Sequence, residues 1–329
     1  MATIRDVAKH AGVSVATVSR VINATGYVHE DTRKKVETAI RELQYTPNEV
    51  ARSLFKKKSR LIGLLLPDIT NPFFPELARG VEDEMQENDF RIIFGNSDEN
   101  MSKEKDYILT FEQNNVVGVI ASTNYPDTDT YRNLSIPVVF LDRTADNRPS
   151  VYADGREGGR IAAQEIIARG SRQITVIQGP KHIRPAQDRF KGAVDVLSEQ
   201  EIPFNVMMAS SFSFTEGDRL AKELFELHPN TDGVIASNDL AATAILHEAL
   251  RLGKRVPEDL QIIGFDDIPI SSLLTPSLTT IRQPAYDMGR AAARLLIQII
   301  ANENIDQNTI QMPVTFTERD TTRKVEQHG

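Results

Sequence analysis

The chain contains no cysteine among its 329 residues. Disulfide bonds, thiolate metal sites and a cysteine nucleophile are therefore excluded. The sequence also lacks any run of about 18 apolar residues, which a membrane-spanning helix would need. Its first residues, Met1 to Asp6, contain no apolar core of a signal peptide. Because neither membrane insertion nor secretion is supported, we expect a cytoplasmic protein.

Motifs of common enzyme classes are missing as well. The sequence contains no G-x-x-x-x-G-K-[ST] loop and no G-x-S-x-G elbow, and its six histidines show no metal-ligand spacing. The segment Gly155–Gly159 is G-x-x-G-G, which lacks the spacing of a dinucleotide-binding loop. A dinucleotide-dependent oxidoreductase is the best enzymatic alternative, since its core is also doubly wound. The sequence predicts instead a protein that is not an enzyme and needs no cofactor or metal.

The charge is distributed unevenly along the chain. The net charge is −8, but residues 1–60 carry twelve Lys/Arg against six Asp/Glu, which gives this segment +6 and the remainder −14. A small basic segment on an acidic body indicates one end that binds a polyanion, with the rest repelled from phosphates. An ordinary solvated basic face is the alternative for this pattern.

The first 47 residues are expected to form three short helices. Thr3 can cap a first helix that Gly12 ends, and Ser14 can cap the second. Apolar residues at i, i+3 and i+4 give the second and third helices one buried face each. The expected elements are a helix that begins at Ile4, a helix over Val15–Asn23 and a helix over Glu30–Leu43.

This helix–tight turn–helix spacing is typical of a DNA-binding domain whose second helix enters the major groove. Arg20 can donate two hydrogen bonds to a guanine, whereas Val15 and Ala16 can make apolar contacts, for example with thymine methyl groups. The polar residues expected at the DNA are Thr3, Ser14, Thr17, Ser19 and Asn23. A three-helix bundle that binds another protein is the alternative that the spacing alone leaves open.

After the basic segment Lys56–Lys58, short apolar runs alternate with amphipathic helical stretches. This order predicts an α/β fold with two doubly wound parallel-sheet lobes, because so many strands exceed one comfortable sheet. The expected strands are Leu61–Leu66, Arg91–Phe94, Val116–Ala121, Val138–Leu141, Ile174–Ile177, Gly233–Ala236 and Gln261–Phe265.

We expect three regions along the chain. They are a helix-turn-helix domain at 1–47, a linking segment at 48–58 and the two-lobed body at 59–329. Within the last, the N-lobe is expected at about 59–157 and 288–319, and the C-lobe at about 158–287 and 320–329. The chain would cross between the lobes near Asp154–Gly159, Gln283–Gly289 and Thr317–Thr321.

Two segments of the head carry a specific family resemblance. Thr3–Asn23 and Tyr45–Leu54 resemble the head of the lactose-repressor/galactose-repressor family, and the resemblance extends over essentially all of the chain. It implies a sequence-specific DNA-binding repressor with a hinge helix and linker at 48–58, in which Asn48–Leu54 orders on the operator. It also implies that the lobes at 59–329 are of periplasmic-binding-protein type and form the effector-binding and dimerisation domain. Leu54 matches the family's minor-groove wedge, with a core leucine as the alternative. The hinge residues expected at the DNA are Asn48, Ala51, Arg52 and Leu54.

The resemblance also implies partners. We expect a homodimer that binds a near-palindromic operator. The two copies would contact each other along the body, first through the lobe containing the helix Phe74–Glu87. The last residues contain no leucine heptads, so a tetramer is not expected. Binding of a small sugar would release the DNA. A phosphocarrier protein acting as co-repressor, known in a related branch of the family, is a further partner that the sequence leaves open.

Polar residues follow the ends of several expected strands, where open α/β sheets place ligands. Carboxylates, amides and guanidinium groups between aromatic rings suit a polyhydroxylated ring. By resemblance to the family and to periplasmic ribose-binding proteins, the sugar hydroxyls would be bound by Asn71, Asp142, Arg143, Arg189, Asn238, Asp266 and Gln283. The ring would lie between Phe73, Phe74 and Phe265.

These residues favour ribose as the effector. Related regulators of other sugars share part of the set, so another sugar is the alternative. Taken singly, Asp142 and Arg143 could be a structural ion pair, and Phe73 and Phe74 could belong to the core. A sugar-binding protein without a regulatory role is the alternative from another class, and the basic head disfavours it.

Overall fold

The chain forms two compact units, Met1–Arg60 and Leu61–Gly329, which we call the head and the body. The computed structural model describes residues 2–23, 25–45, 59–143, 147–305 and 307–325. The expected hinge residues Asn48, Ala51, Arg52 and Leu54 lie outside the described residues. No helix in the described ranges is both long and apolar enough to cross a membrane.

The head consists of three helices, as expected: α1 (Ile4–Ala11), α2 (Val15–Asn23) and α3 (Glu30–Glu42). Thr3 and Asp6 form a reciprocal capping box at the start of α1. Gly12 ends this helix at φ +64°, in the left-handed region that glycine adopts without strain. The three helices pack around a small core of Val7, Ala8, Val18, Val21, Val36 and Ala39.

The N-lobe of the body is built on a six-stranded sheet with the order β11-β5-β4-β3-β1-β2. All of its strand pairs are parallel. The strands are β1 (Leu61–Leu66), β2 (Arg91–Asn96), β3 (Val119–Ala121), β4 (Val138–Leu141), β5 (Ser150–Ala153) and β11 (Thr309–Met312). The helices of this lobe are α5 (Phe73–Glu87), α6 (Met101–Gln113), α7 (Asp129–Arg132) and α12 (Ala285–Ile300).

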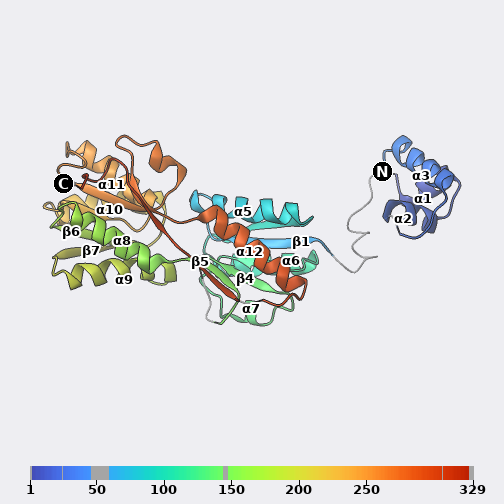
Figure 1. Cartoon of the computed structure of the whole chain (residues 1–329), viewed down its shortest axis with the longest axis horizontal. Coiled ribbons are helices and arrows are strands. Elements are labelled where there is room, and N and C mark those ends of the chain that lie inside the picture. Colours follow the sequence, from blue (N-terminus) through green and yellow to red (C-terminus); the bar gives the residue numbers. More distant parts are fainter. Residues whose placement is uncertain (1, 24, 46–58, 144–146, 306, 326–329) are drawn as a thin grey trace. The chain divides into compact units, whose positions relative to one another are not determined.

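Both faces of this sheet are covered, which explains why its strands are apolar without alternation. Ile62, Leu64 and Leu66 of β1 belong to the core shared with α5 and α12. Leu65 belongs to a second core that contains Phe111 of α6. Figure 1 shows α5 and α12 side by side in this lobe.

The C-lobe repeats this architecture with a sheet of order β12-β10-β9-β8-β6-β7, parallel except for the antiparallel β10–β12 pair. The strands are β6 (Ile174–Gln178), β7 (Phe204–Met208), β8 (Gly233–Ile235), β9 (Gln261–Asp266), β10 (Thr279–Arg282) and β12 (Thr315–Thr317). The helices are α8 (Gly155–Ala168), α9 (Arg184–Glu199), α10 (Phe214–Leu227), α11 (Asp239–Arg251) and the 3₁₀ turn η1 (Pro269–Ser272). The predicted fold class, a three-helix head followed along the chain by two doubly wound lobes, is therefore confirmed.

The chain passes between the two sheets three times. It leaves β5 for α8 at Asp154, and it leaves β10 for α12 at Gln283 and Pro284. The third crossing differs from the sequence prediction near Thr317–Thr321, since it lies between Met312 and Thr315. The reason is strand pairing: 309–312 extends the first sheet beside β5, and 315–317 pairs antiparallel with β10 of the second.

The glycines of the G-x-x-G-G segment serve helix packing in α8. A Cβ at Gly159 would lie 2.0 Å from the backbone oxygen of Arg189 in α9, and a Cβ at Gly158 would lie 2.7 Å from the Phe265 ring. Only glycine permits these approaches. The segment therefore brings α8 against α9 and β9, and this packing accounts for the motif without a dinucleotide.

Candidate functional site

The head presents its expected DNA-contacting residues on and before α2. Val15, Ala16 and Arg20 are exposed, and Val15 keeps 41% of its surface although it is apolar. Because Val18 and Val21 of the same helix are buried in the head core, the exposed residues lie on the side of α2 turned away from it. An exposed face carrying an arginine and small apolar groups is suited to base edges in a major groove.

The polar residues predicted for the phosphates also stabilise the head itself. Ser14 Oγ accepts a hydrogen bond from the Thr17 amide at 3.1 Å and lies 2.9 Å from Thr17 Oγ1. Asn23 Nδ2 donates to the Ser19 carbonyl at 2.9 Å. Thr3 Oγ1 donates to Asp6 Oδ2 at 2.7 Å. These groups therefore hold the ends of α1 and α2 in place while they remain partly exposed.

One exposed aromatic residue of the head was not singled out from the sequence. Tyr27 is 88% exposed in the connection between α2 and α3. An aromatic ring so close to the second helix is a candidate for contact with DNA. Its position after Gly26 in a loop gives no periodic signal, so the sequence pattern could not point to it.

In the body, the expected sugar ligands lie at the carboxyl ends of strands from both sheets. Arg143 follows β4, and its guanidinium is almost completely buried. It donates to Glu99 Oε1 at 2.7 Å and to Asn124 Oδ1 at 2.9 Å. Its centre lies 5.8 Å from the centre of the Phe74 ring. Arg143 is thus fixed by two residues that sequence analysis had not named.

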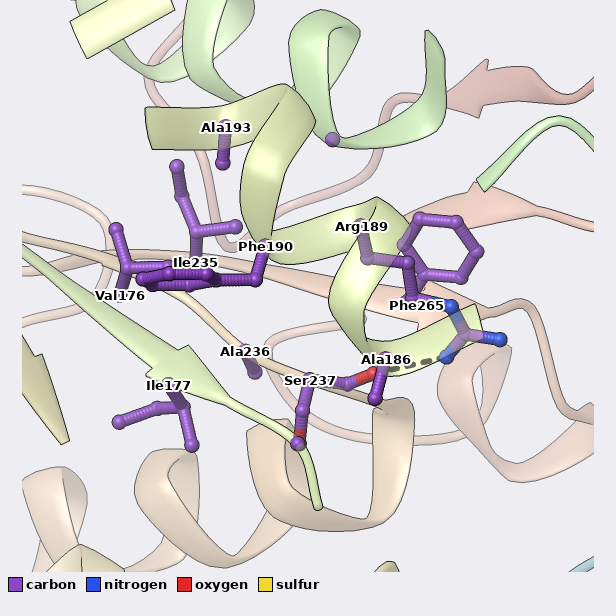
Figure 2. Close-up of a pocket in the computed structure, with 12 residues that line it drawn as sticks. Val176, Ile177, Ala186, Arg189, Phe190, Ala193, Ile235, Ala236, Ser237 and Phe265 are labelled. Carbon is purple, nitrogen blue, oxygen red and sulfur yellow. Dashed lines mark hydrogen bonds between the residues drawn. The ribbon is translucent and has the colours of Figure 1, made fainter. Parts of the chain in front are cut away.

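Arg189 of α9 is the corresponding cation of the C-lobe. Its Nη1 donates to the Ser237 carbonyl at 2.9 Å, and its Nη2 lies 3.2 Å from Asp266 Oδ1. The guanidinium centre lies 3.9 Å from the centre of the Phe265 ring and 5.8 Å from that of Phe212. Figure 2 shows the Arg189 side chain extending past the Phe265 ring to its bond with Ser237.

Asp266 ends β9 and joins these groups to the next strand. Its Oδ1 accepts a hydrogen bond from Gln283 Nε2 at 2.7 Å. Its φ of 110° is unusual for a residue with a side chain, so the local fold must hold it there. The structure thereby brings Arg189, Phe265, Asp266 and Gln283 together, as the sequence predicted they would lie.

Two buried carboxylates from different lobes interact at this place. Burial raises the pKa of Asp142, and the positive charges of Arg143 and Arg189 oppose this effect. Burial likewise raises the pKa of Asp266 to about 6, opposed by Arg189 and reinforced by the negative charge of Asp142. Asp142 of the N-lobe and Arg189 of the C-lobe therefore belong to one electrostatic group.

Four of the expected ligands also have structural roles. Asn71 Oδ1 accepts from the Phe73 amide at 3.1 Å, and Asn238 caps α11 through the Ala241 amide at 2.9 Å. Asn238 Nδ2 also donates to the Phe212 carbonyl at 3.1 Å. Phe73 packs edge-on against Phe74, with ring centres 5.3 Å apart, and both belong to the core of the body.

Several buried polar atoms around these residues lack a hydrogen-bond partner within the described ranges. They are Asn124 Nδ2, Arg143 Nε, Arg189 Nε and Ser237 Oγ. Buried donors without partners are costly, and a polar ligand is one way to satisfy them. Arg143 Nε lies 3.9 Å from Asp142 Oδ2, too far for a hydrogen bond. Hydroxyl groups of a ligand would be suitable partners for these atoms.

A small cavity borders the same residues. Its volume is about 10 Å³, room for about one water molecule. Arg189, Ser237 and Phe265 line it, together with apolar walls that include Val176 and Ile235 (Figure 2). It is too small for a sugar, so it extends the polar cluster and is not itself the sugar's position.

Comparisons with known proteins identify relatives of both units of the chain. Residues 3–48 match the model of bacterial regulatory proteins of the lacI family, and residues 163–322 match a periplasmic binding protein-like domain. A ribose operon repressor from Bacillus subtilis is 60% identical over 324 residues, which are 98% of this chain and 99% of that protein.

Solved structures show the same architecture. A lac repressor dimer bound to operator and an anti-inducer superposes with a TM-score of 0.90 at 26% identity, covering 98% of this chain and 99% of that one. A lacI-family regulator from Enterococcus faecium with bound ribose has a TM-score of 0.73 at 30% identity, covering 80% of this chain and 98% of that one.

Proposed function

Because the chain belongs to the lacI family of bacterial regulatory proteins, we propose that it represses a ribose-utilisation operon and that ribose is its effector. The family consists of DNA-binding transcriptional regulators and not of enzymes, and operator binding and dimerisation are typical of it. The observation that carries the ribose assignment is 60% identity with a ribose operon repressor over nearly the whole of both chains. A protein that binds operator DNA must be in the cytoplasm, and we infer this location for the chain.

At the operator, α2 enters the major groove. Arg20 donates to a guanine, and Val15 and Ala16 contact thymine methyl groups. The polar residues that precede α1 and α2 or lie on α2 contact phosphate oxygens and set the register of the helix. The phosphate contacts are made by Thr3, Ser14, Thr17, Ser19 and Asn23. The hinge contacts, outside the described residues, are made by Asn48, Ala51, Arg52 and Leu54.

In the body, ribose binds among the buried polar groups of the two lobes. Its hydroxyls donate to the carboxylates Asp142 and Asp266 and accept from the guanidinium groups of Arg143 and Arg189. Asn71, Asn238 and Gln283 supply amide contacts. Phe73, Phe74 and Phe265 lie against the C–H faces of the ring. The unpartnered donors of Arg143 and Arg189 support this arrangement.

Ribose lowers operator affinity because it favours one arrangement of the two lobes over another. For the affinity to fall tenfold, the coupling between sugar and DNA must be about 1.4 kcal/mol. Asp142 and Arg189 carry opposite charges and come from different lobes, so a sugar bonded to both would bias that arrangement. The arrangement would in turn set the spacing of the two hinge segments in a dimer.

The functional unit is a homodimer that reads a two-fold operator. The two copies contact each other along the body, first through the N-lobe that contains α5, and exposed apolar side chains of the C-lobe offer further surface for this contact. They are Leu250, Leu252, Ile270 and Leu273, exposed by 42%, 47%, 45% and 79%. Light scattering after size exclusion should give twice the mass of the 36.7 kDa chain.

Calorimetry with ribose, fructose, sucrose and glucose tests the effector assignment. Ribose should bind more tightly than the other three sugars. If another sugar binds and ribose gives no heat, the assignment of ribose as the effector is wrong. The assignment of the chain as a DNA-binding regulator would still stand. Addition of a phosphocarrier protein to the operator complex tests the co-repressor alternative, since a co-repressor would tighten operator binding.

A further inference from the structure

A buried carboxylate next to the proposed sugar site has no place in the function described so far. Asp239 is the first residue of α11, directly after the capping residue Asn238, and none of its surface is exposed. A buried carboxylate needs hydrogen-bond donors around it, and the donors identify which parts of the fold it connects.

Three donors from two other segments converge on Asp239. Its Oδ2 accepts from the Ile268 amide at 2.9 Å and from Ser271 Oγ at 2.7 Å. Its Oδ1 accepts from Thr280 Oγ1 at 2.6 Å. The carboxylate therefore ties the start of α11 to the turn after β9 and to strand β10.

Strand β9 passes directly beside the same carboxylate. A Cβ at Gly264 would lie 2.1 Å from Asp239 Oδ1, so no side chain fits at this position. Gly264 is two residues before Asp266 in the strand, and Ile268 is two residues after it. Asp239 thus contacts the chain on both sides of the site residue Asp266.

The backbone between those two contacts is unusual. Asp266 and Asp267 have φ values of 110° and 59°, both in the left-handed region that residues with side chains rarely adopt. Such conformations persist where surrounding bonds hold them. The bond from Ile268 to Asp239 is one of these, and Asp267 is held further by Arg319 Nη2 at 2.6 Å.

The backbone at Asp266 aims its carboxylate at the other site residues. Asp266 Oδ1 accepts from Gln283 Nε2 and lies 3.2 Å from Arg189 Nη2. Thr280 Oγ1, which binds Asp239, is in the same strand, β10, that leads to Gln283. One buried carboxylate therefore forms hydrogen bonds with two adjacent segments that carry expected ligands.

We propose that Asp239 is a positioning residue of the sugar site: without touching the sugar, it holds the turn after β9 so that Asp266 meets Gln283 and Arg189. This inference rests on the proposed function for its sugar. Its partners also tolerate a neutral side chain, because Ser271 and Thr280 carry hydroxyls that can accept as well as donate. The pKa of Asp239 is raised to about 7 by burial and by the charge of Asp266, and those hydroxyls would satisfy the protonated form.

The test compares substitutions at Asp239 with a matched control. Asp239→Ala removes all three acceptor contacts, whereas Asp239→Asn keeps the shape and can donate to Thr280 Oγ1. The control is Asp232→Ala. Asp232 accepts from the Arg172 and Gln173 amides at 3.0 and 2.9 Å, and it precedes β8, at the opposite end of the same sheet.

Two readouts on the full-length chain separate positioning from mere stability. Calorimetry should show that Asp239→Ala weakens the best-bound sugar of the four-sugar panel at least about tenfold. Asp239→Asn should stay within about threefold of the wild-type chain, and Asp232→Ala should lower thermal stability without changing sugar affinity. The second readout is the Gln283 side-chain amide signal in ¹H–¹⁵N spectra without sugar, which should move in Asp239→Ala and not in the control.

Unchanged sugar affinity and an unmoved Gln283 signal in Asp239→Ala would overturn the inference. If Asp239→Ala does not fold, Ser271→Ala removes a single donor, and the same two readouts decide in the same way. If the wild-type chain binds none of the four sugars, the proposed function fails. The Gln283 signal then decides the role of Asp239 alone, since it requires no sugar.

Discussion

The guanidinium centre of Arg189 lies 3.9 Å from the centre of the Phe265 ring, while the same group reaches the carboxylate of Asp266, the next residue in β9. One arginine from α9 therefore contacts both an aromatic face and an anion of a single strand end. A planar, delocalised cation is suited to this double role, and an ammonium group is not.

Replacing Arg189 by lysine should weaken ribose binding about 10- to 100-fold, because the ammonium cannot stack on Phe265 and reach Asp266 together. Operator affinity without sugar should not change, since the head is a separate unit. Calorimetry measures the first effect and fluorescence anisotropy the second. Arg219→Lys in α10 is the matched control, because the ion pairs of Arg219 in the described part of the chain are with Glu216 and Glu223 of its own helix. Equal losses in both variants would contradict the assigned role of Arg189.

Ribose affinity should fall in mildly acidic solution. Ionised Asp266 binds the Arg189 cation more strongly than its protonated form does, and the pKa of Asp266 is raised to about 6 by burial and the charge of Asp142. Affinity should therefore be constant from pH 8 to about 7 and fall as the pH drops through about 6. Calorimetric titrations at several pH values give the profile. In Asp266→Asn, binding should be weak and independent of pH over this range, and a persisting acid limb would contradict the assignment to Asp266.

Replacing Arg20 by alanine should weaken specific operator binding by about 1–3 kcal/mol, roughly 5- to 150-fold, and relax selectivity at one base pair. Anisotropy with a set of single-base operator variants measures the selectivity. A loss that is uniform across all variants would mean that Arg20 contacts phosphate and no base.

Ser14→Ala should act differently from the Arg20 substitution. It removes the cap on α2 that binds the Thr17 amide, so it should lower the stability of the head by about 1 kcal/mol.

The stability of the body should depend on the charge of Asp239. Its pKa is raised from 3.8 to about 7, so the folded chain retains a proton that the unfolded chain releases. The contribution of this group to stability is complete below about pH 4 and is lost as the pH rises through about 7. Asp239→Asn removes that loss, so its stability relative to the wild-type chain should improve from pH 5 to pH 8. Urea denaturation at each pH tests this, and a constant difference would show that Asp239 is ionised throughout.

Much of the architecture could be predicted because the sequence carries it locally. The apolar runs of strands such as β1 lack alternation, which indicates burial on both faces, and the structure confirms two covered faces. Polar residues after those strands predicted a ligand site at the carboxyl edge of the sheet, and Arg189, Asp266 and Gln283 lie in contact there. The caps at Thr3 and Ser14 are short-range features that three or four residues suffice to reveal.

The remainder depends on contacts between residues far apart in the chain. Glu99 binds Arg143 across 44 residues, and Asp239 binds Thr280 across 41. Neither pairing leaves a periodic signal. The third crossing between the lobes was misplaced because Pro313 and Val314 separate two short strands that join different sheets. Nor could the sequence show that Asn238 caps α11 as well as lying at the site.

We propose that this protein binds an operator and that ribose weakens this binding. Fluorescence anisotropy with a labelled duplex from the region upstream of the chain's own coding sequence tests it most directly. The duplex is titrated with and without ribose at two salt concentrations. We predict selective binding that weakens steeply with salt, by about 0.9 log units per phosphate contact per log unit of salt, and that weakens at least about tenfold further with ribose. Operator binding that ribose leaves unchanged or tightens would contradict the account.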